Sequence, residues 1–131
     1  MEPPRFKLAG VVLSTPDPSA SARFYERLLG WPRLMDEAGW VVLRDDDAST
    51  ALSFHLDEHY RPPVWPTDPE QQQMMLHVDL VTDDLAAAVA LAEECGATRH
   101  PHQTDQDEVV MIDPDGHPFC LIRRESWWTH E

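Results

Sequence analysis

The chain has 131 residues, enough for one domain with a hydrophobic core that needs no disulfide or metal to hold it together. Its hydrophobic content is 42%, but no run approaches the roughly 18 apolar residues of a membrane span, so we expect no membrane partner. A net charge of −14 without a basic cluster argues against nucleic acid as a partner. The start lacks the features of a secretory signal, so the expected location is cytoplasmic.

The first half of the sequence predicts a strand, a helix and further strands. Residues 6–14 are rich in Val and Leu and predict a strand. Asp17 is placed to cap a helix over residues 19–29, and Gly30 follows where a left-handed residue would end it. Strands are expected over residues 39–43 and 51–56.

The second half repeats this pattern. A strand is predicted over residues 77–81, where a period of two puts Leu76, Val78 and Leu80 on a dry face and His77 and Asp79 on a wetter one. A helix is predicted between the capping pair at residues 83–84 and Gly96. A hairpin of strands 108–112 and 119–123 follows, joined by an Asp-Pro-Asp-Gly turn.

Two segments lie outside this repeat. Residues 58–73 contain four prolines and predict an extended surface crossing between the halves. The tail, residues 125–131, carries Trp127 and Trp128, which we expect to pack on the body of the protein or on a second subunit.

Two β-α-β-β-β modules joined in this way resemble the vicinal oxygen chelate superfamily, which contains glyoxalase I, bleomycin resistance proteins and extradiol dioxygenases. The resemblance covers residues 6–124 and depends on matched runs at residues 11–18, 24–25 and 29–30 in the first module and 76–81, 83–85, 95–97 and 113–119 in the second. The stretch at residues 60–66 is similar to the uncharacterised glyoxalase-like branch of the superfamily. It implies an α+β fold in which two tandem βαβββ modules form a curved-sheet cup. The expected domain is a single one: module 1 at 6–57, a crossing at 58–73 and module 2 at 74–124.

The same resemblance places four metal-ligand positions at Gly10, His55, His77 and Cys120. Gly10 has no donor atom, and Cys120 stands where a glutamate is usual. His55, His77 and Cys120 remain as candidates to bind Zn, Ni, Mn or Fe, because a catalytic zinc needs about three protein donors. We favour a site without a complete catalytic metal set, in which these side chains line a ligand cavity. A surface metal at His100 and His102 is a weaker alternative.

Two functions follow from the resemblance. The favoured one is binding of a small aromatic molecule in the cup between the modules. The alternative is a metal-dependent lyase or dioxygenase of the glyoxalase I or extradiol type, so the sequence leaves enzymatic activity undecided. Many superfamily members are dimers, which predicts a homodimer. The residues expected at the ligand are His77, His55, Cys120, Trp40 and Trp65.

Overall fold

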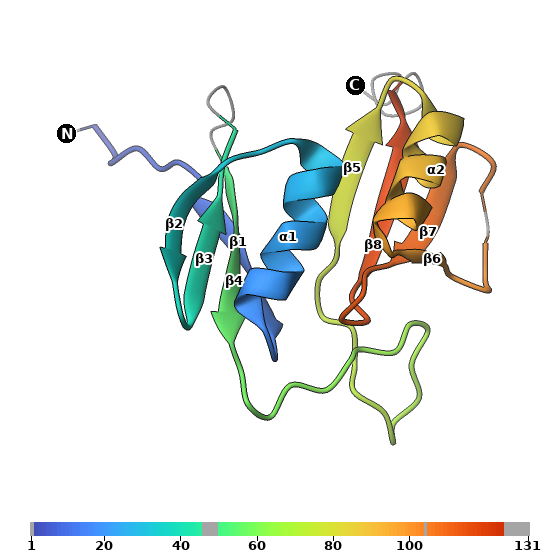
Figure 1. The fold of residues 1–131 in the computed structure, drawn as a ribbon, viewed down its shortest axis with the longest axis horizontal. Coiled ribbons are helices and arrows are strands. Elements are labelled where there is room, and N and C mark those ends of the chain that lie inside the picture. Colours follow the sequence, from blue (N-terminus) through green and yellow to red (C-terminus); the bar gives the residue numbers. More distant parts are fainter. Residues whose placement is uncertain (1, 46–49, 104, 125–131) are drawn as a thin grey trace. The chain divides into compact units, whose positions relative to one another are not determined.

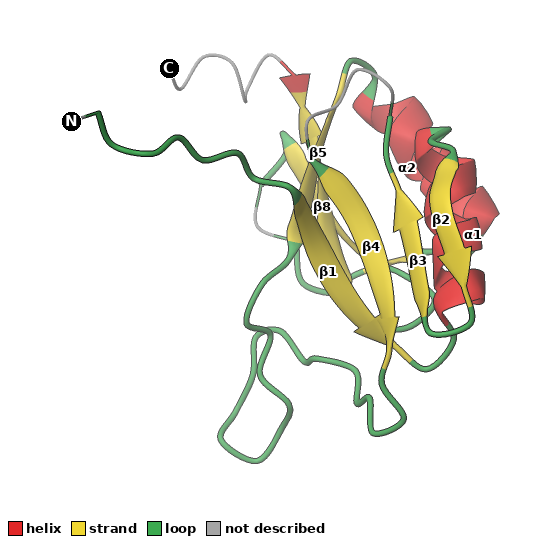
Figure 2. Ribbon diagram, turned by 90° about the vertical axis from the view of Figure 1, so that its left-hand side faces the viewer, coloured by secondary structure: helices red, strands yellow, loops and turns green. Residues whose placement is uncertain are grey.

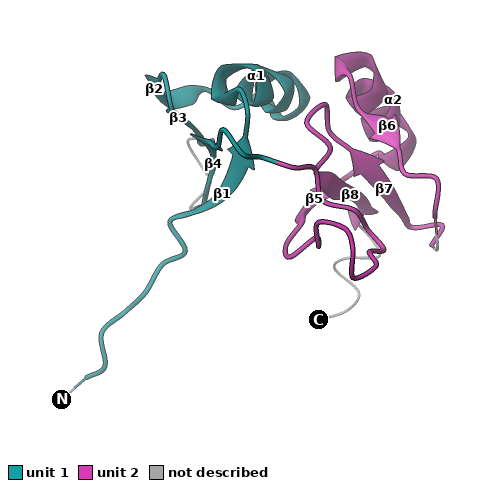
Figure 3. Cartoon of the chain, turned by 90° about the horizontal axis from the view of Figure 1, so that it is seen from below, with its two compact units in different colours: residues 1–60 teal, residues 61–131 magenta. Residues whose placement is uncertain are grey.

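A computed structural model describes residues 2–45, 50–103 and 105–124, and the predicted Trp127–Trp128 tail lies outside this range. The chain divides into two compact units, unit 1 over Met1–Tyr60 and unit 2 over Arg61–Glu131 (Figure 3). Each unit follows the order β-α-β-β-β along the chain (Figure 1). The predicted α+β fold of two βαβββ modules is therefore confirmed.

Unit 1 contains a four-stranded sheet in the order β1-β4-β3-β2 (Figure 2). β1 pairs with β4 in parallel, while β4–β3 and β3–β2 are antiparallel. The strands and the helix of this unit are β1 (Gly10–Thr15), α1 (Pro18–Leu29), β2 (Arg33–Glu37), β3 (Trp40–Leu43) and β4 (Ala51–Leu56). The buried side chains of α1, β3 and β4 form the core, and they include Ala22, Phe24, Tyr25, Val41, Leu43, Leu52 and Phe54.

Unit 2 repeats the arrangement with the sheet order β5-β8-β7-β6. Its elements are β5 (Val78–Thr82), α2 (Leu85–Cys95), β6 (Thr98–Arg99), β7 (Glu108–Ile112) and β8 (Pro118–Arg123). α2 covers one face of the sheet (Figure 1), where apolar side chains are buried: Leu85, Val89, Ala92, Met111, Phe119 and Leu121. Alternate residues, including Cys120, face the other side of the sheet.

The predicted helix ends are confirmed in both units. The Asp17 carboxylate accepts a hydrogen bond from the Ala20 N–H at 3.1 Å, and Asp84 does the same for Ala87 at 3.0 Å. Gly30 and Gly96 have φ angles of 72° and 117°, the left-handed region that glycine enters without strain. Local capping chemistry therefore sets the length of both helices.

The start of the first strand was predicted wrongly. β1 begins at Gly10 instead of Phe6, whereas β5 begins at Val78, one residue after the start that the sequence predicted. Phe6 is 91% exposed and Leu76 is 79% exposed, so Leu76 does not belong to the dry face of a strand. Strand pairing explains where these strands begin. The first residue of β1 pairs with Ala51 and the first residue of β5 pairs with Phe119, and the apolar residues before them have no neighbouring strand.

The proline-rich segment also differs from the predicted extended crossing. The Val64 N–H donates to the Gln72 carbonyl at 2.9 Å, and an isolated bridge joins Val64 to Gln73, so the segment closes on itself as a loop. At its start, Pro62 touches the turn before β8, because a Cβ added at Gly116 would lie 2.7 Å from the Pro62 Cβ. We call residues 61–73 the strap. Its path places the Trp65 ring against His77 of the same unit.

Candidate functional site

The register of the unit 2 sheet gathers three polar side chains on the face opposite α2. Asp79 of β5 is the partner of Cys120 in the parallel β5–β8 ladder, and His77 lies two residues before Asp79. Partners in a ladder project to the same side of the sheet, and His77, just before β5, reaches that side to contact Asp79. The His77 Nε2 lies 3.0 Å from Asp79 Oδ1. One ligand atom from each of His77, Asp79 and Cys120 lies within 4.8 Å of the others.

Cys120 is the buried member of this cluster. Its side chain has no exposed surface, whereas those of His77 and Asp79 are 28% and 37% exposed. Burial raises the pKa of the Cys120 thiol well above its ordinary value, and hydrogen bonding and charge from Glu108, with a smaller contribution from Asp79, raise it further. The thiol of the metal-free protein therefore stays protonated at neutral pH and donates to a carboxylate.

This raised pKa predicts a loss of stability at alkaline pH. Above the ordinary thiol pKa of about 8.5, the unfolded chain releases the Cys120 proton while the folded chain keeps it, so the free energy of unfolding falls by about 1.4 kcal/mol per pH unit from this group. Urea unfolding in chelator between pH 8 and 10 should show a steeper decline for the wild type than for Cys120→Ala. Parallel declines would contradict the assignment.

The strap brings an indole ring to the same cluster. The Trp65 ring stacks on the His77 imidazole, with ring centroids 5.0 Å apart and an angle of 27° between the planes. His100 holds the backbone at this point, because its Nε2 hydrogen-bonds to the Trp65 carbonyl oxygen. The His102 N–H donates to His100 Nδ1 at 3.0 Å, so Nε2 carries the proton and donates. A neutral His100 thus fixes Trp65 over His77.

A pocket of about 180 Å³ opens beside Trp65, lined by Trp65, Pro66, His100, His102 and Val110. The Gln103 side chain holds the backbone of Val110, one of these lining residues, in place. The Gln103 amide accepts from the Val110 N–H at 3.0 Å and donates to the Val110 carbonyl at 2.8 Å, as a neighbouring strand would. The pocket therefore combines a flat aromatic side, an aliphatic floor and imidazole groups on a wall that the sheet positions.

The remaining sequence-predicted residues belong to unit 1. Trp40 and His55 are partners in the β3–β4 ladder, with ring centroids 6.3 Å apart in an edge-on arrangement. Gly10 begins β1, and a Cβ there would lie 3.2 Å from the Ala51 carbonyl oxygen. A side chain at the first predicted ligand position would therefore be crowded by the neighbouring strand.

The strand registers show which residues of unit 1 correspond to which residues of unit 2. The sequence alone did not give this correspondence. Val11 pairs with Leu52 in unit 1, and Val78 pairs with Phe119 in unit 2. If Gly10 corresponds to His77, as the repeat indicates, then Ser53 corresponds to Cys120. The counterpart of His55 is then Ile122. By register, the two units therefore do not offer matched pairs of ligand side chains.

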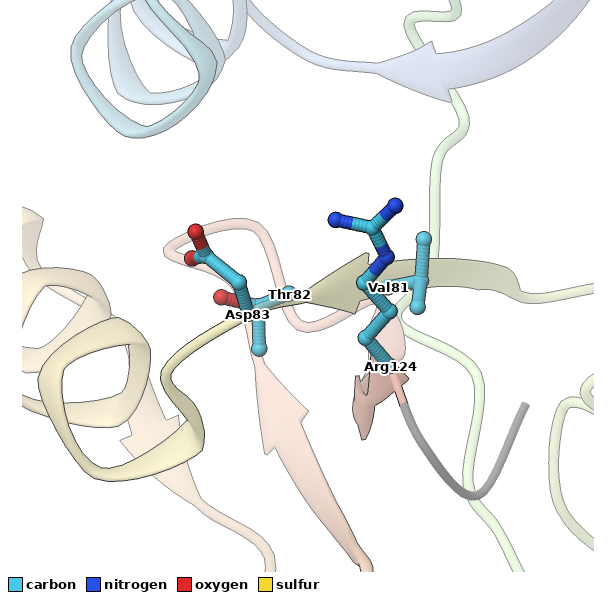
Figure 4. Close-up of a pocket in the computed structure, with 4 residues that line it drawn as sticks. All are labelled: Val81, Thr82, Asp83 and Arg124. Carbon is cyan, nitrogen blue, oxygen red and sulfur yellow. The ribbon is translucent and has the colours of Figure 1, made fainter. Parts of the chain in front are cut away.

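A second pocket, of about 340 Å³, lies at the end of β5 and is lined by Val81, Thr82, Asp83 and Arg124 (Figure 4). It contains none of the residues expected at the ligand. Arg124 and Val81 point to the same side of β5 in Figure 4, with Asp83 at the start of the turn into α2. We assign it no role, because an open surface hollow with one cation and one carboxylate has no chemistry specific to a ligand.

The sequence analysis did not predict that Asp79, Glu108 and His100 lie beside the residues expected at the ligand. Asp79 carries a usable signal, since it alternates with His77 on the polar face of a predicted strand. Glu108 and His100 carry none, because their approach to Cys120 and Trp65 depends on the β7–β8 register and on the path of the strap.

The comparisons with known proteins agree with this fold. Residues 10–122 match the family model described as a glyoxalase-like domain, so the chain belongs to the glyoxalase-like domain family within the vicinal oxygen chelate superfamily. No curated protein matches the sequence. Among the described residues, no helix is long and apolar enough to cross a membrane.

Solved structures with this architecture include a glyoxalase/bleomycin resistance protein/dioxygenase family enzyme from Burkholderia phytofirmans PsJN. The TM-score is 0.70 at 17% identity, over 90% of this chain and 98% of that one. A glyoxalase/bleomycin resistance protein from Albidiferax ferrireducens T118 gives 0.65 at 16%, over 89% and 98%. TnmS3, an antibiotic binding protein from Streptomyces sp. CB03234, gives 0.54 at 25% identity, over 86% and 92%.

Proposed function

We propose that this glyoxalase-like protein binds a small aromatic molecule through the face of unit 2 that carries Trp65, His77 and Cys120. The observation that carries the proposal is the fixed position of the Trp65 ring. This ring stacks on the His77 imidazole and also lines a pocket of about 180 Å³. TnmS3, at 25% identity, is an antibiotic binding protein, which supports binding of a small molecule by this fold. Trp40 and His55 of unit 1 stay in the proposed ligand-binding set.

The lining indicates what kind of molecule would bind. Indole, proline and valine surfaces favour a flat apolar ring, and an engineered cavity of about 150 Å³ takes up benzene, so this pocket suits a single ring of a larger ligand. His102 is exposed and supplies a polar contact at the rim. A net charge of −14 disfavours anions, so the expected ligand is neutral or cationic.

A thermal-shift screen with aromatic metabolites and antibiotics, run in chelator, tests this function. A ligand that binds only the folded chain raises the melting temperature. For a molecule found in this way, Trp65→Ala should weaken binding by about tenfold or more, as the loss of a central aromatic contact does. His59→Ala, which removes an exposed imidazole from unit 1, should bind like the wild type. Equal affinity in both variants would show that Trp65 is not part of the site.

The second candidate function is a metal-dependent lyase or dioxygenase of the glyoxalase I or extradiol type. The cluster of His77, Asp79 and Cys120 favours it, because three donors of these kinds suit a divalent metal. A bound metal would supply polarisation of a substrate oxygen. Turnover that requires added metal would favour this enzyme; stabilisation by organic molecules in chelator favours the binder.

Three further assignments belong to the same proposal. We treat the two units as one glyoxalase-like domain, because the family match runs through both of them. The homodimer and the cytoplasmic location predicted from the sequence are retained. Light scattering of the whole chain, giving twice the mass of one chain or the mass of a single chain, decides the oligomeric state.

A further inference from the structure

The turn between β7 and β8, residues 113–117, is a closely bonded element outside the proposed pocket. The Gly116 N–H donates to the Asp113 carbonyl at 2.9 Å, and the Asp113 N–H donates to the His117 carbonyl at 2.9 Å. The side chains of Asp113 and His117 are buried and hydrogen-bond to each other. The backbone at Gly116 is therefore fixed, and its φ of 96° is a conformation that glycine adopts without strain.

The strap begins against this turn. A Cβ added at Gly116 would lie 2.7 Å from the Pro62 Cβ and 3.4 Å from the Pro62 Cγ, so the strap comes this close because position 116 has no side chain. The Pro62 Cβ belongs to a ring that is closed onto the backbone, so it cannot turn aside as the end of a long side chain could. A larger residue at position 116 would therefore displace the strap backbone.

The next fixed point of the strap is Trp65. Its carbonyl oxygen is hydrogen-bonded to His100, and its indole stacks on the His77 imidazole with ring centroids 5.0 Å apart. Only two residues separate Pro62 from Trp65, and the first of them is another proline with a fixed φ. So short and stiff a connection cannot absorb a displacement at Pro62, and the displacement reaches the indole.

We propose that Gly116 is a positioning residue for the aromatic-binding site: its lack of a side chain makes room for Pro62 and thereby sets the place of the Trp65 indole over His77. Gly116 does not line the pocket, and its effect passes through the strap. The inference rests on the proposed function for its ligand. The position of the indole, however, can be measured without a ligand.

Proton NMR of the whole chain measures the stacking directly. The ring current of the Trp65 indole shifts the imidazole signals of His77, Trp65→Ala gives the positions of these signals without that ring, and His77→Asn identifies them. We expect Gly116→Ala to move the His77 signals towards their positions in Trp65→Ala. It should also weaken the binding of phenol, used as a single-ring probe, by about tenfold. In a Pro62→Gly background, Gly116→Ala should cause no further movement, because the opposing Cβ is gone.

Gly96→Ala is the matched control for backbone strain. Gly96 also has a positive φ, 117°, but a Cβ there would meet only the Pro114 Cγ at 3.5 Å, an ordinary contact. This variant strains the backbone as Gly116→Ala does, yet it should leave the His77 signals in place. Equal movement in the two variants overturns the proposal. So does the full Gly116→Ala movement in the Pro62→Gly background.

Circular dichroism verifies that each variant folds. If Gly116→Ala does not fold, Pro62→Gly alone tests the proposal, because it removes the same contact from the side of the strap. The His77 signals should then move towards their positions in Trp65→Ala, and unmoved signals overturn the proposal. Absence of phenol binding by the wild type counts against the proposed function, and the His77 signals still decide the role of Gly116.

Discussion

Replacement of Phe54 by Ala is expected to lower the free energy of unfolding by about 3–5 kcal/mol, the range for removing a fully buried aromatic side chain. Phe54 has no exposed surface, and its ring stacks on Tyr25 with centroids 5.5 Å apart and 26° between the planes. The substitution removes this contact and leaves a cavity between β4 and α1 that the packed surroundings cannot fill. Equilibrium urea unfolding of the two proteins measures the difference.

The matched control for Phe54→Ala is Val12→Ala, which shortens a side chain in the same sheet. Val12 is 52% exposed, so its replacement should cost less than about 1 kcal/mol. If the two variants lose similar stability, the core of unit 1 does not lie between α1 and the sheet as described.

Replacement of Asp113 by Ala should cost about 3–5 kcal/mol, the range for removing one member of a buried charged pair. The Asp113 carboxylate is buried in the turn before β8, where it accepts the backbone N–H groups of Asp115 and His117 at 3.0 and 2.9 Å. One of its oxygens also lies 2.9 Å from His117 Nδ1. Without the carboxylate, these backbone N–H groups and His117 Nδ1 lose their hydrogen-bond partner inside a buried turn.

Two further variants make the Asp113 prediction specific. Asp113→Asn keeps one acceptor oxygen and should lose less stability than Asp113→Ala. Asp83→Ala removes an exposed carboxylate and should stay within about 0.5 kcal/mol of the wild type. Thermal unfolding at constant pH compares the three. An Asp113→Ala chain as stable as Asp83→Ala would show that the carboxylate is not needed to hold the turn.

The parts of the fold that local chemistry determines could be predicted from the sequence. Asp17 and Asp84 cap the helices that Gly30 and Gly96 end, and strand β4 lies over residues 51–56 as alternation indicated. Strands β2 and β6 were missed. β2 has mostly exposed residues, and β6 has only two residues, so neither carries a hydrophobic period long enough to detect.

The candidate site could be predicted in part for the same reason. His77 was found because it alternates with apolar residues, and Cys120 because it occupies a position that matters in the resembling superfamily. His77 and Cys120 lie close to Asp79 because the strand register pairs residues about 40 positions apart, and no local sequence pattern predicts that register. Trp65 and His100 meet through the loop of the strap. Such contacts depend on tertiary packing, so they become visible only in the structure.

The Gln103 side chain also protects the outer edge of the unit 2 sheet. Strand β6 covers only two residues, and the edge of β7 beyond it would offer Val110 backbone groups to an unrelated chain. The Gln103 side chain hydrogen-bonds to both the N–H and the carbonyl of Val110, and the His100 N–H donates to the same carbonyl. The Val110 backbone groups are therefore already hydrogen-bonded and cannot pair with a strand from another chain. Open edges of this kind seed aggregation. Gln103 thus shields this edge of the sheet from strand pairing and also holds Val110, which lines the pocket.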